Sequence, residues 1–158
     1  MKNVKKNNKG FTIIEVVLVL AIAGLIFLIV FLALPRLQRS RRDTQRKNDG
    51  GNLVAQLENY GSAHNGSLTG LTAANLNGTV AGQFKFDYMT ANGGQFNDPQ
   101  SGTVYTLALG TTTPAATGTF NISLGTGGTK CDGSTVTTAR DIVVRARLES
   151  GEYCQSNS

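Results

Sequence analysis

The strongest pattern along the chain is an apolar run from Phe11 to Leu34 that holds a single charged residue, Glu15. Its 24 residues would form a helix of about 36 Å, and the hydrocarbon core of a membrane is about 30 Å thick. A soluble helix that is apolar on all sides would need a larger protein around it. The run therefore predicts a membrane-spanning helix.

The helical pattern continues beyond Pro35, because residues 36–60 contain many good helix formers, mainly Arg, Gln and Leu, with Glu58. Leu53, Leu57 and Tyr60 recur at i, i+4 and i+7, which predicts one apolar face on an otherwise polar helix. Gly50-Gly51 interrupts this pattern. We expect a second helical half, residues 36–63, whose apolar face carries a sheet.

The rest of the chain alternates apolar and polar residues in short stretches separated by Gly-rich turns. Such alternation predicts half-buried strands, and the short turns favour an antiparallel meander. The predicted fold class is therefore α+β, with a long N-terminal helix packed on a small antiparallel β-sheet head. The alternating apolar positions are Phe84, Phe86 and Tyr88; Tyr105, Leu107 and Leu109; Phe120, Ile122 and Leu124; and Ile142, Val144, Ala146 and Leu148.

The formal net charge of +5 comes mostly from the first ten residues, which carry four lysines. Without them the side-chain charge is 5 − 4 = +1. A second basic cluster follows the apolar run, so charge on the two flanks does not fix the orientation in a membrane. Three interpretations of that cluster stay open: a solvated or lipid-facing helix surface, pairing with acidic groups of neighbouring subunits, and DNA capture. Its members are Arg36, Arg39, Arg41, Arg42, Arg46 and Lys47.

The two cysteines, Cys131 and Cys154, bracket the last predicted strand. In an exported chain an even count suggests one disulfide, and two unpaired thiols are the alternative. His64 is the only histidine, so a Ser-His-Asp triad could form only around it. One His and two Cys also do not show the ligand spacing of a zinc site. No phosphate-binding glycine loop occurs. We therefore expect no catalysis, no metal site and no cofactor.

The segment Lys9-Gly10-Phe11-Thr12-Ile13-Ile14-Glu15 resembles the processing site of type IV prepilins. The resemblance implies cleavage after Gly10 by a prepilin peptidase, N-methylation of Phe11, and an assembly role for Glu15 as the fifth residue of the mature chain. It also implies that helical structure is weakened between Gly24 and Pro35, as an unwound stretch in a filament or as a plain kink.

The resemblance divides the chain into a leader, residues 1–10; a transmembrane and filament-core helix, 11–35; a helical spine, 36–63; and a β-rich head with a C-terminal disulfide loop, 64–158. Asn97-Asp98-Pro99-Gln100-Ser101-Gly102-Thr103-Val104-Tyr105 resembles an Asp-Pro-x-x-Gly-x-x-Tyr turn of pilins and major pseudopilins. No match to the pseudopilin calcium loop is found.

We therefore expect a pilus subunit that resides in the inner or cytoplasmic membrane as a precursor and then in an extracellular surface filament. The implied partners are other pilin subunits, the prepilin peptidase, the assembly platform with its ATPase, and membrane lipid. DNA or a host surface would be contacted by the filament in adhesion, motility or DNA uptake. The alternative is a minor pilin, or a secretion or competence pseudopilin, that binds DNA or a receptor.

Overall fold

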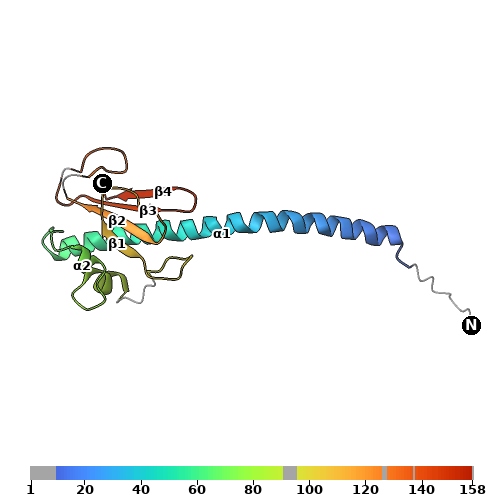
Figure 1. Ribbon diagram of the computed structural model, residues 1–158, viewed down its shortest axis with the longest axis horizontal. Coiled ribbons are helices and arrows are strands. Elements are labelled where there is room, and N and C mark those ends of the chain that lie inside the picture. The colour runs from blue at the N-terminus through green and yellow to red at the C-terminus, as the bar shows by residue number, and fades with distance from the viewer. Residues whose placement is uncertain (1–9, 91–95, 126–127, 137, 158) are drawn as a thin grey trace, which may run out of the picture. The chain divides into compact units, whose positions relative to one another are not determined.

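The computed structural model describes residues 10–90, 96–125, 128–136 and 138–157. It divides into two compact units, Met1–Gln38 and Arg39–Ser158. Figure 1 shows the elements in chain order. They are α1 (Ile13–Ala63), α2 (Ala73–Leu76), the π-helix η1 (Lys85–Thr90), β1 (Thr106–Leu109), β2 (Thr119–Leu124), β3 (Ile142–Arg147) and β4 (Glu152–Ser156).

Helix α1 is continuous from Ile13 to Ala63 and includes Gly24 and Pro35. The helix is therefore not unwound between these two residues in the single chain, while the unwound stretch in a filament and the plain kink stay predictions. The physical reason is that Pro35 removes one backbone hydrogen bond and Gly24 costs only about 1 kcal/mol relative to Ala, while the surrounding residues are strongly helical. Gly50-Gly51 does not interrupt the helix either.

The four strands form one sheet in the order β1-β2-β3-β4. Strands β2, β3 and β4 are antiparallel neighbours, but β1 runs parallel to β2. The prediction of a purely antiparallel sheet is thus wrong at this edge. Alternation of apolar residues says nothing about strand direction, and the segment 110–118, when extended, is long enough to return along a four-residue strand. The α+β class, with a long helix and a small sheet, is confirmed.

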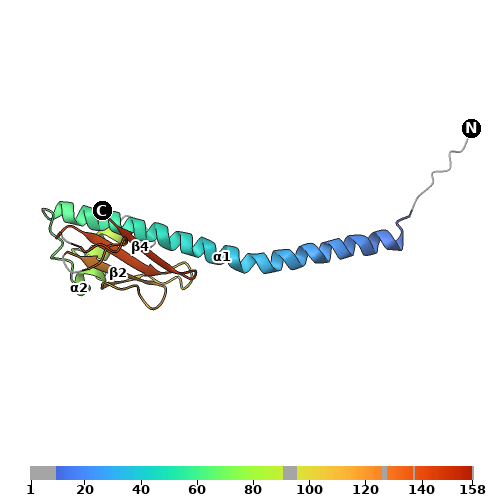
Figure 2. The ribbon, with the colours of Figure 1, turned by 90° about the horizontal axis from the view of Figure 1, so that it is seen from above.

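In the unit Arg39–Ser158 the sheet lies along the C-terminal half of α1, as the view from above shows (Figure 2). The predicted apolar face of the helix is confirmed, because Leu53, Leu57 and Tyr60 are all buried. They pack with β2 and β3 residues such as Phe120 and Val144 in one continuous core. This core is where the head is fastened to its helix.

The predicted strand through Phe84, Phe86 and Tyr88 is wrong, because the segment forms η1. Phe84 and Tyr88 lie four residues apart and stack with their ring centroids 5.4 Å apart. Both rings also make edge contacts with Tyr60 of α1. A helical turn brings residues i and i+4 onto one face, so this aromatic cluster favours the turn over an extended strand.

The segment 128–136 covers the last two strands, β3 and β4, on the side of the sheet away from the core. Val143 is fully buried, and Arg145 donates a hydrogen bond to the carbonyl of Thr129. Cys131 of this segment forms a disulfide with Cys154 of β4, with 5.6 Å between the two Cα atoms. Strand β4 itself was not predicted, because its sequence is polar and lacks apolar alternation.

Candidate functional site

The sequence places the candidate site at the start of the chain, and the structure gives this segment a simple geometry. Gly10 and Phe11 precede the first helical residue, Ile13, and both are exposed. The side chain of Phe11 is 90% exposed. The Gly10–Phe11 peptide bond therefore lies in a non-helical, accessible stretch of the kind that a peptidase can bind.

The first turn of α1 is closed by a capping box between Thr12 and Glu15. One carboxylate oxygen of Glu15, Oε2, accepts hydrogen bonds from the Thr12 N–H at 2.9 Å and from its hydroxyl at 2.7 Å. The Thr12 hydroxyl oxygen accepts from the Glu15 N–H in return, at 3.4 Å. These bonds satisfy N-terminal helix donors that otherwise lack partners. Sequence reasoning missed Thr12, although the pattern Thr-x-x-Glu before an apolar run was the available signal.

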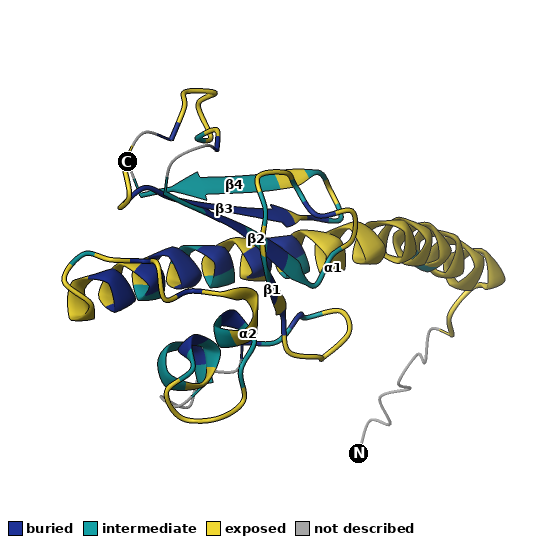
Figure 3. Ribbon diagram, turned by 60° about the vertical axis from the view of Figure 1, so that its left-hand side comes forward, coloured by how far each residue is buried: buried dark blue, intermediate teal, exposed yellow. Residues whose placement is uncertain are grey.

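Beyond the cap, α1 presents apolar side chains on all sides, which Figure 3 shows as exposed turns. Every large apolar side chain from Phe11 to Leu34 is at least 47% exposed, the minimum being that of Leu34. Of the helices described, α1 alone is long and apolar enough to cross a membrane, with a window of mean hydropathy 3.3. Water is a poor solvent for such a surface, because burying one Leu or Phe side chain is worth about 1.5–3 kcal/mol.

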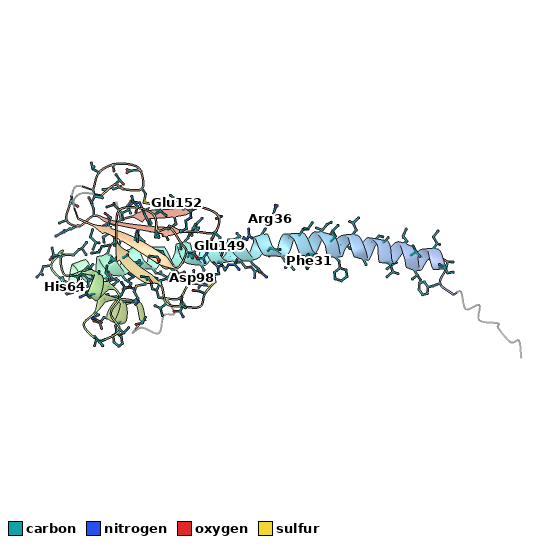
Figure 4. The ribbon with its side chains drawn as sticks, in the orientation of Figure 1. Phe31, Arg36, His64, Asp98, Glu149 and Glu152 are labelled. Carbon is teal, nitrogen blue, oxygen red and sulfur yellow. A yellow bond between two sulfur atoms is a disulfide. The ribbon has the colours of Figure 1, made fainter. Side chains whose placement is uncertain are left out.

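A buried ionic network joins α1 to two loops of the head, and Arg46 is at its centre. The Arg46 side chain is 1% exposed. Its Nε donates to Asp98 at 2.7 Å, and its Nη1 donates to Asp43 at 3.2 Å and to Glu149 at 3.1 Å. Arg42 binds both oxygens of Glu149, at 2.6 and 2.7 Å. Asp98 and Glu149 come from separate loops and both lie close to the helix (Figure 4).

The carboxylate of Asp43 binds the turn between β3 and β4. It accepts hydrogen bonds from the backbone N–H groups of Glu149 and Ser150, both at 2.9 Å, and from the Ser150 hydroxyl. Burial alone would raise the pKa of Asp43, but these bonds and Arg46 hold it below its usual value. For Glu149, the bond from Arg42 is the main cause of a lowered pKa. Both carboxylates are therefore held in their charged forms.

Asp98 explains the turn motif noted in the sequence. Its second oxygen, Oδ2, accepts from the N–H groups of Gln100 and Ser101, at 3.2 and 3.0 Å, and Gly102 takes a positive φ of 69°. Burial opposes ionisation of Asp98, but Arg46 and these N–H groups lower its pKa overall. The motif thus shapes a turn and aims a carboxylate at the helix.

The last residue of the motif, Tyr105, donates its hydroxyl hydrogen to Asp49 of α1 across 3.0 Å. Here burial dominates and raises the pKa of both side chains. Asp49 receives no cation in the described part of the chain, unlike Asp98 and Asp43. Both ends of the motif therefore contact α1: Asp98 through its ion pair with Arg46, and Tyr105 through the hydrogen bond from its neutral hydroxyl to Asp49.

The network changes the interpretation of the basic cluster. Arg42 and Arg46 are used inside the head, so they are not available to neighbouring subunits or nucleic acid. Arg36, Arg39 and Arg41 are exposed. The sequence could not make this division, because Asp98 lies 52 residues from Arg46 and Glu149 lies 103 residues from it.

The remaining candidates have local roles in the structure. The His64 ring stacks on Tyr60 with 3.9 Å between centroids, and its Nδ1 lies 2.8 Å from the Tyr60 carbonyl oxygen. Among the described residues, no group of three or more His, Cys, Asp or Glu is placed to hold a metal ion. The four lysines of residues 1–9 lie outside the described part of the chain.

Comparison with known proteins adds one match. Residues 5–31 match the family model of the prokaryotic N-terminal methylation motif. Neither the curated proteins nor the solved structures include a significant match to the chain. This motif supports a type IV pilin-like or pseudopilin-like protein, and the long helix with a small mixed sheet is a pilin-like architecture.

Proposed function

We propose that this pilin-like chain is a structural subunit of a type IV pilus. The precursor is held in the inner or cytoplasmic membrane by α1, cleaved after Gly10 by the prepilin peptidase and N-methylated at Phe11. It then polymerises through α1 into an extracellular filament, driven by the assembly platform and its ATPase. Adhesion, twitching motility and DNA uptake would be properties of that filament rather than of the single chain.

The exposed apolar surface of α1, which begins directly at the methylation motif, is the observation that carries this proposal. A surface that is apolar on every side requires lipid or other apolar helices around it. Membrane lipid meets that requirement before assembly, and the α1 helices of other subunits meet it afterwards. One helix can therefore serve as an anchor first and as the filament core later.

Glu15 supplies the specificity that a smooth apolar helix lacks. An acidic residue near the centre of a membrane costs about 2.5–3.5 kcal/mol, and somewhat less near the end of a helix. The capping bonds to Thr12 use Oε2 alone. Cleavage would create a free ammonium at Phe11, and we propose that the Glu15 carboxylate pairs with the Phe11 ammonium of a neighbouring subunit. Such a pair in a low-dielectric setting would fix the axial register between subunits.

The test compares three variants in a strain that makes no other pilin. Glu15→Ala and Glu15→Gln should insert in the membrane and be cleaved after Gly10, yet form few filaments. Glu15→Gln is the sharper change, because its amide oxygen can still accept the Thr12 hydrogen bonds while the charge is gone. Thr12→Val is the control, since it removes the capping hydroxyl and keeps the carboxylate.

Filament counts by electron microscopy, together with an immunoblot for processing, decide the outcome. Wild-type filament numbers from Glu15→Gln would contradict the intermolecular role. If Thr12→Val lost filaments as completely as Glu15→Gln did, the local cap rather than the charge would be the essential feature.

A further inference from the structure

The exposed arginines that follow the apolar run differ from their neighbours Arg42 and Arg46 in having no ion-pair partner among the described residues of the head. Arg42 and Arg46 are paired with Glu149, Asp98 and Asp43. In the described residues no hydrogen bond or ion pair joins the guanidinium of Arg39 or Arg41 to another side chain, and both are exposed. Arg36 is exposed as well, so three of the five arginines between residues 36 and 46 are left for a partner outside the chain.

The positions of these arginines along α1 match the depth of lipid head groups. The apolar run ends at Leu34. At 1.5 Å per residue, Arg36, Arg39 and Arg41 follow it by about 3, 7.5 and 10.5 Å. The polar layer on each side of the hydrocarbon core is about 5–8 Å thick, and arginine side chains extend back toward it. Lys47 is also exposed but lies about 20 Å beyond Leu34, out of reach of that layer.

The arrangement around the helix fits lipid better than a flat binding surface. Arg39 and Arg41 are two residues apart, which separates their side chains by about 200° around α1. A duplex or a single protein partner would approach from one side and meet only one of them. Lipid head groups surround a membrane helix and can contact both at once.

We propose that Arg36, Arg39 and Arg41 bind the head groups of anionic phospholipids and hold the unassembled subunit at a fixed depth in the membrane. This inference rests on the proposed membrane insertion of the precursor, but not on filament assembly. Each basic residue near an anionic surface gains about 1 kcal/mol, a factor of about five in affinity. The contact should weaken with added salt, because exposed charges are screened beyond about 10 Å at 0.1 M.

The test uses the full precursor purified in a neutral detergent, with phosphatidylglycerol and phosphatidylcholine as the two probes. Native mass spectrometry counts the lipids bound to the monomer. The wild type should prefer phosphatidylglycerol, and the triple variant Arg36→Gln, Arg39→Gln, Arg41→Gln should lose about a hundredfold in affinity for it while its phosphatidylcholine binding stays unchanged. The lysines of the leader are present in both chains, so the difference reports the arginines.

Lys47→Gln is the matched control, an exposed cation on the same helix, and should change the binding less than twofold. A triple variant that binds phosphatidylglycerol as well as the wild type would overturn the proposal. So would a Lys47→Gln effect as large as that of the triple variant, since depth would then not matter. Duplex DNA bound with the same arginine dependence, without any preference for phosphatidylglycerol, would make nucleic acid the partner and overturn it as well.

Discussion

The guanidinium of Arg46 on α1 and the carboxylate of Asp98 in the head lie 2.7 Å apart, and both side chains are almost fully buried. The pair joins positions 52 residues apart in the chain. Because Arg46 also binds Asp43 and Glu149, one cation from the helix holds three carboxylates and, through them, two loops. This relationship fastens the head to the same helix that carries the methylation motif.

Replacing Arg46 by Met should therefore destabilise the head strongly. The change would leave buried carboxylates without their cation, which costs about 3–5 kcal/mol. Thermal unfolding of the full chain in detergent, followed by the circular dichroism of the sheet, measures this. Arg39→Met is the matched control, because Arg39 is exposed and surface changes usually stay within about 0.5 kcal/mol. Equal melting temperatures for the two variants would show that the network is not what holds the head.

Two carboxylates at this contact, Asp98 of the turn motif and Asp49 of α1, which binds Tyr105, should respond oppositely to neutralisation at pH 7. Asp98→Asn should lower the free energy of unfolding, since the pKa of Asp98 is lowered by Arg46 and the turn N–H groups despite its burial. Asp49→Asn should preserve or raise it, because burial raises the pKa of Asp49 and the charged form is the unfavourable one. Denaturant titrations of both variants check the sign, and a loss from Asp49→Asn as large as that from Asp98→Asn would refute this assignment.

The same pKa shifts predict how stability depends on pH. The folded pKa values of Asp43, Asp98 and Glu149 lie below the unfolded values of about 3.9 for Asp and 4.3 for Glu. Their contribution is complete above the unfolded pKa and is lost as the pH falls through the folded pKa. The melting temperature should therefore change little between pH 5 and pH 7 and fall below about pH 4. A maximum on the acidic side of pH 4 would contradict the network's role.

Replacing either of two adjacent glycines of α1 by Ala should change the stability of the head in opposite directions. A Cβ at Gly50 would lie 2.4 Å from a ring carbon of Tyr153 on β4, while one at Gly51 would meet only Gln155 at 3.4 Å. Overpacking costs about 1–3 kcal/mol, whereas Gly to Ala in a helix gains about 1 kcal/mol. Gly50→Ala should lower the melting temperature and Gly51→Ala should preserve or raise it. Stabilisation by Gly50→Ala would show that β4 does not need this close approach.

The helix and three of the strands, β1, β2 and β3, were predictable because their signals are local, although the direction of β1 was not. Each of these signals lies within one element: the apolar run, the helix face of Leu53, Leu57 and Tyr60, and the alternation in β1, β2 and β3. Strand β4 was missed because it is polar and is held by its neighbour and a disulfide rather than by an apolar face. The π-helix was missed because alternating aromatics also match an i, i+4 stack, which depends on Tyr60 of another element.

The candidate functional residues also divide into those with a local sequence signal and those without one. Gly10, Phe11 and Glu15 follow from a contiguous motif, and Thr12 was within reach of the same pattern. The ionic network could not be predicted from the sequence, because its charged groups meet only after the chain has folded. No residue near Arg46 in the sequence indicates Asp98 or Glu149 as its partner. Counting basic residues therefore overestimated the free charge beyond the membrane segment by two arginines.

The intact mass of the protein in sheared surface filaments tests the central claim most directly. The account predicts the mass of residues 11–158 plus one methyl group on Phe11, less the two hydrogens lost in the Cys131–Cys154 disulfide. Methylation of Phe11 and oxidation of the cysteines can be separated by repeating the measurement after reduction. A mass that still contains residues 1–10, a mass that lacks the apolar helix, or the absence of this chain from the filament fraction would contradict it.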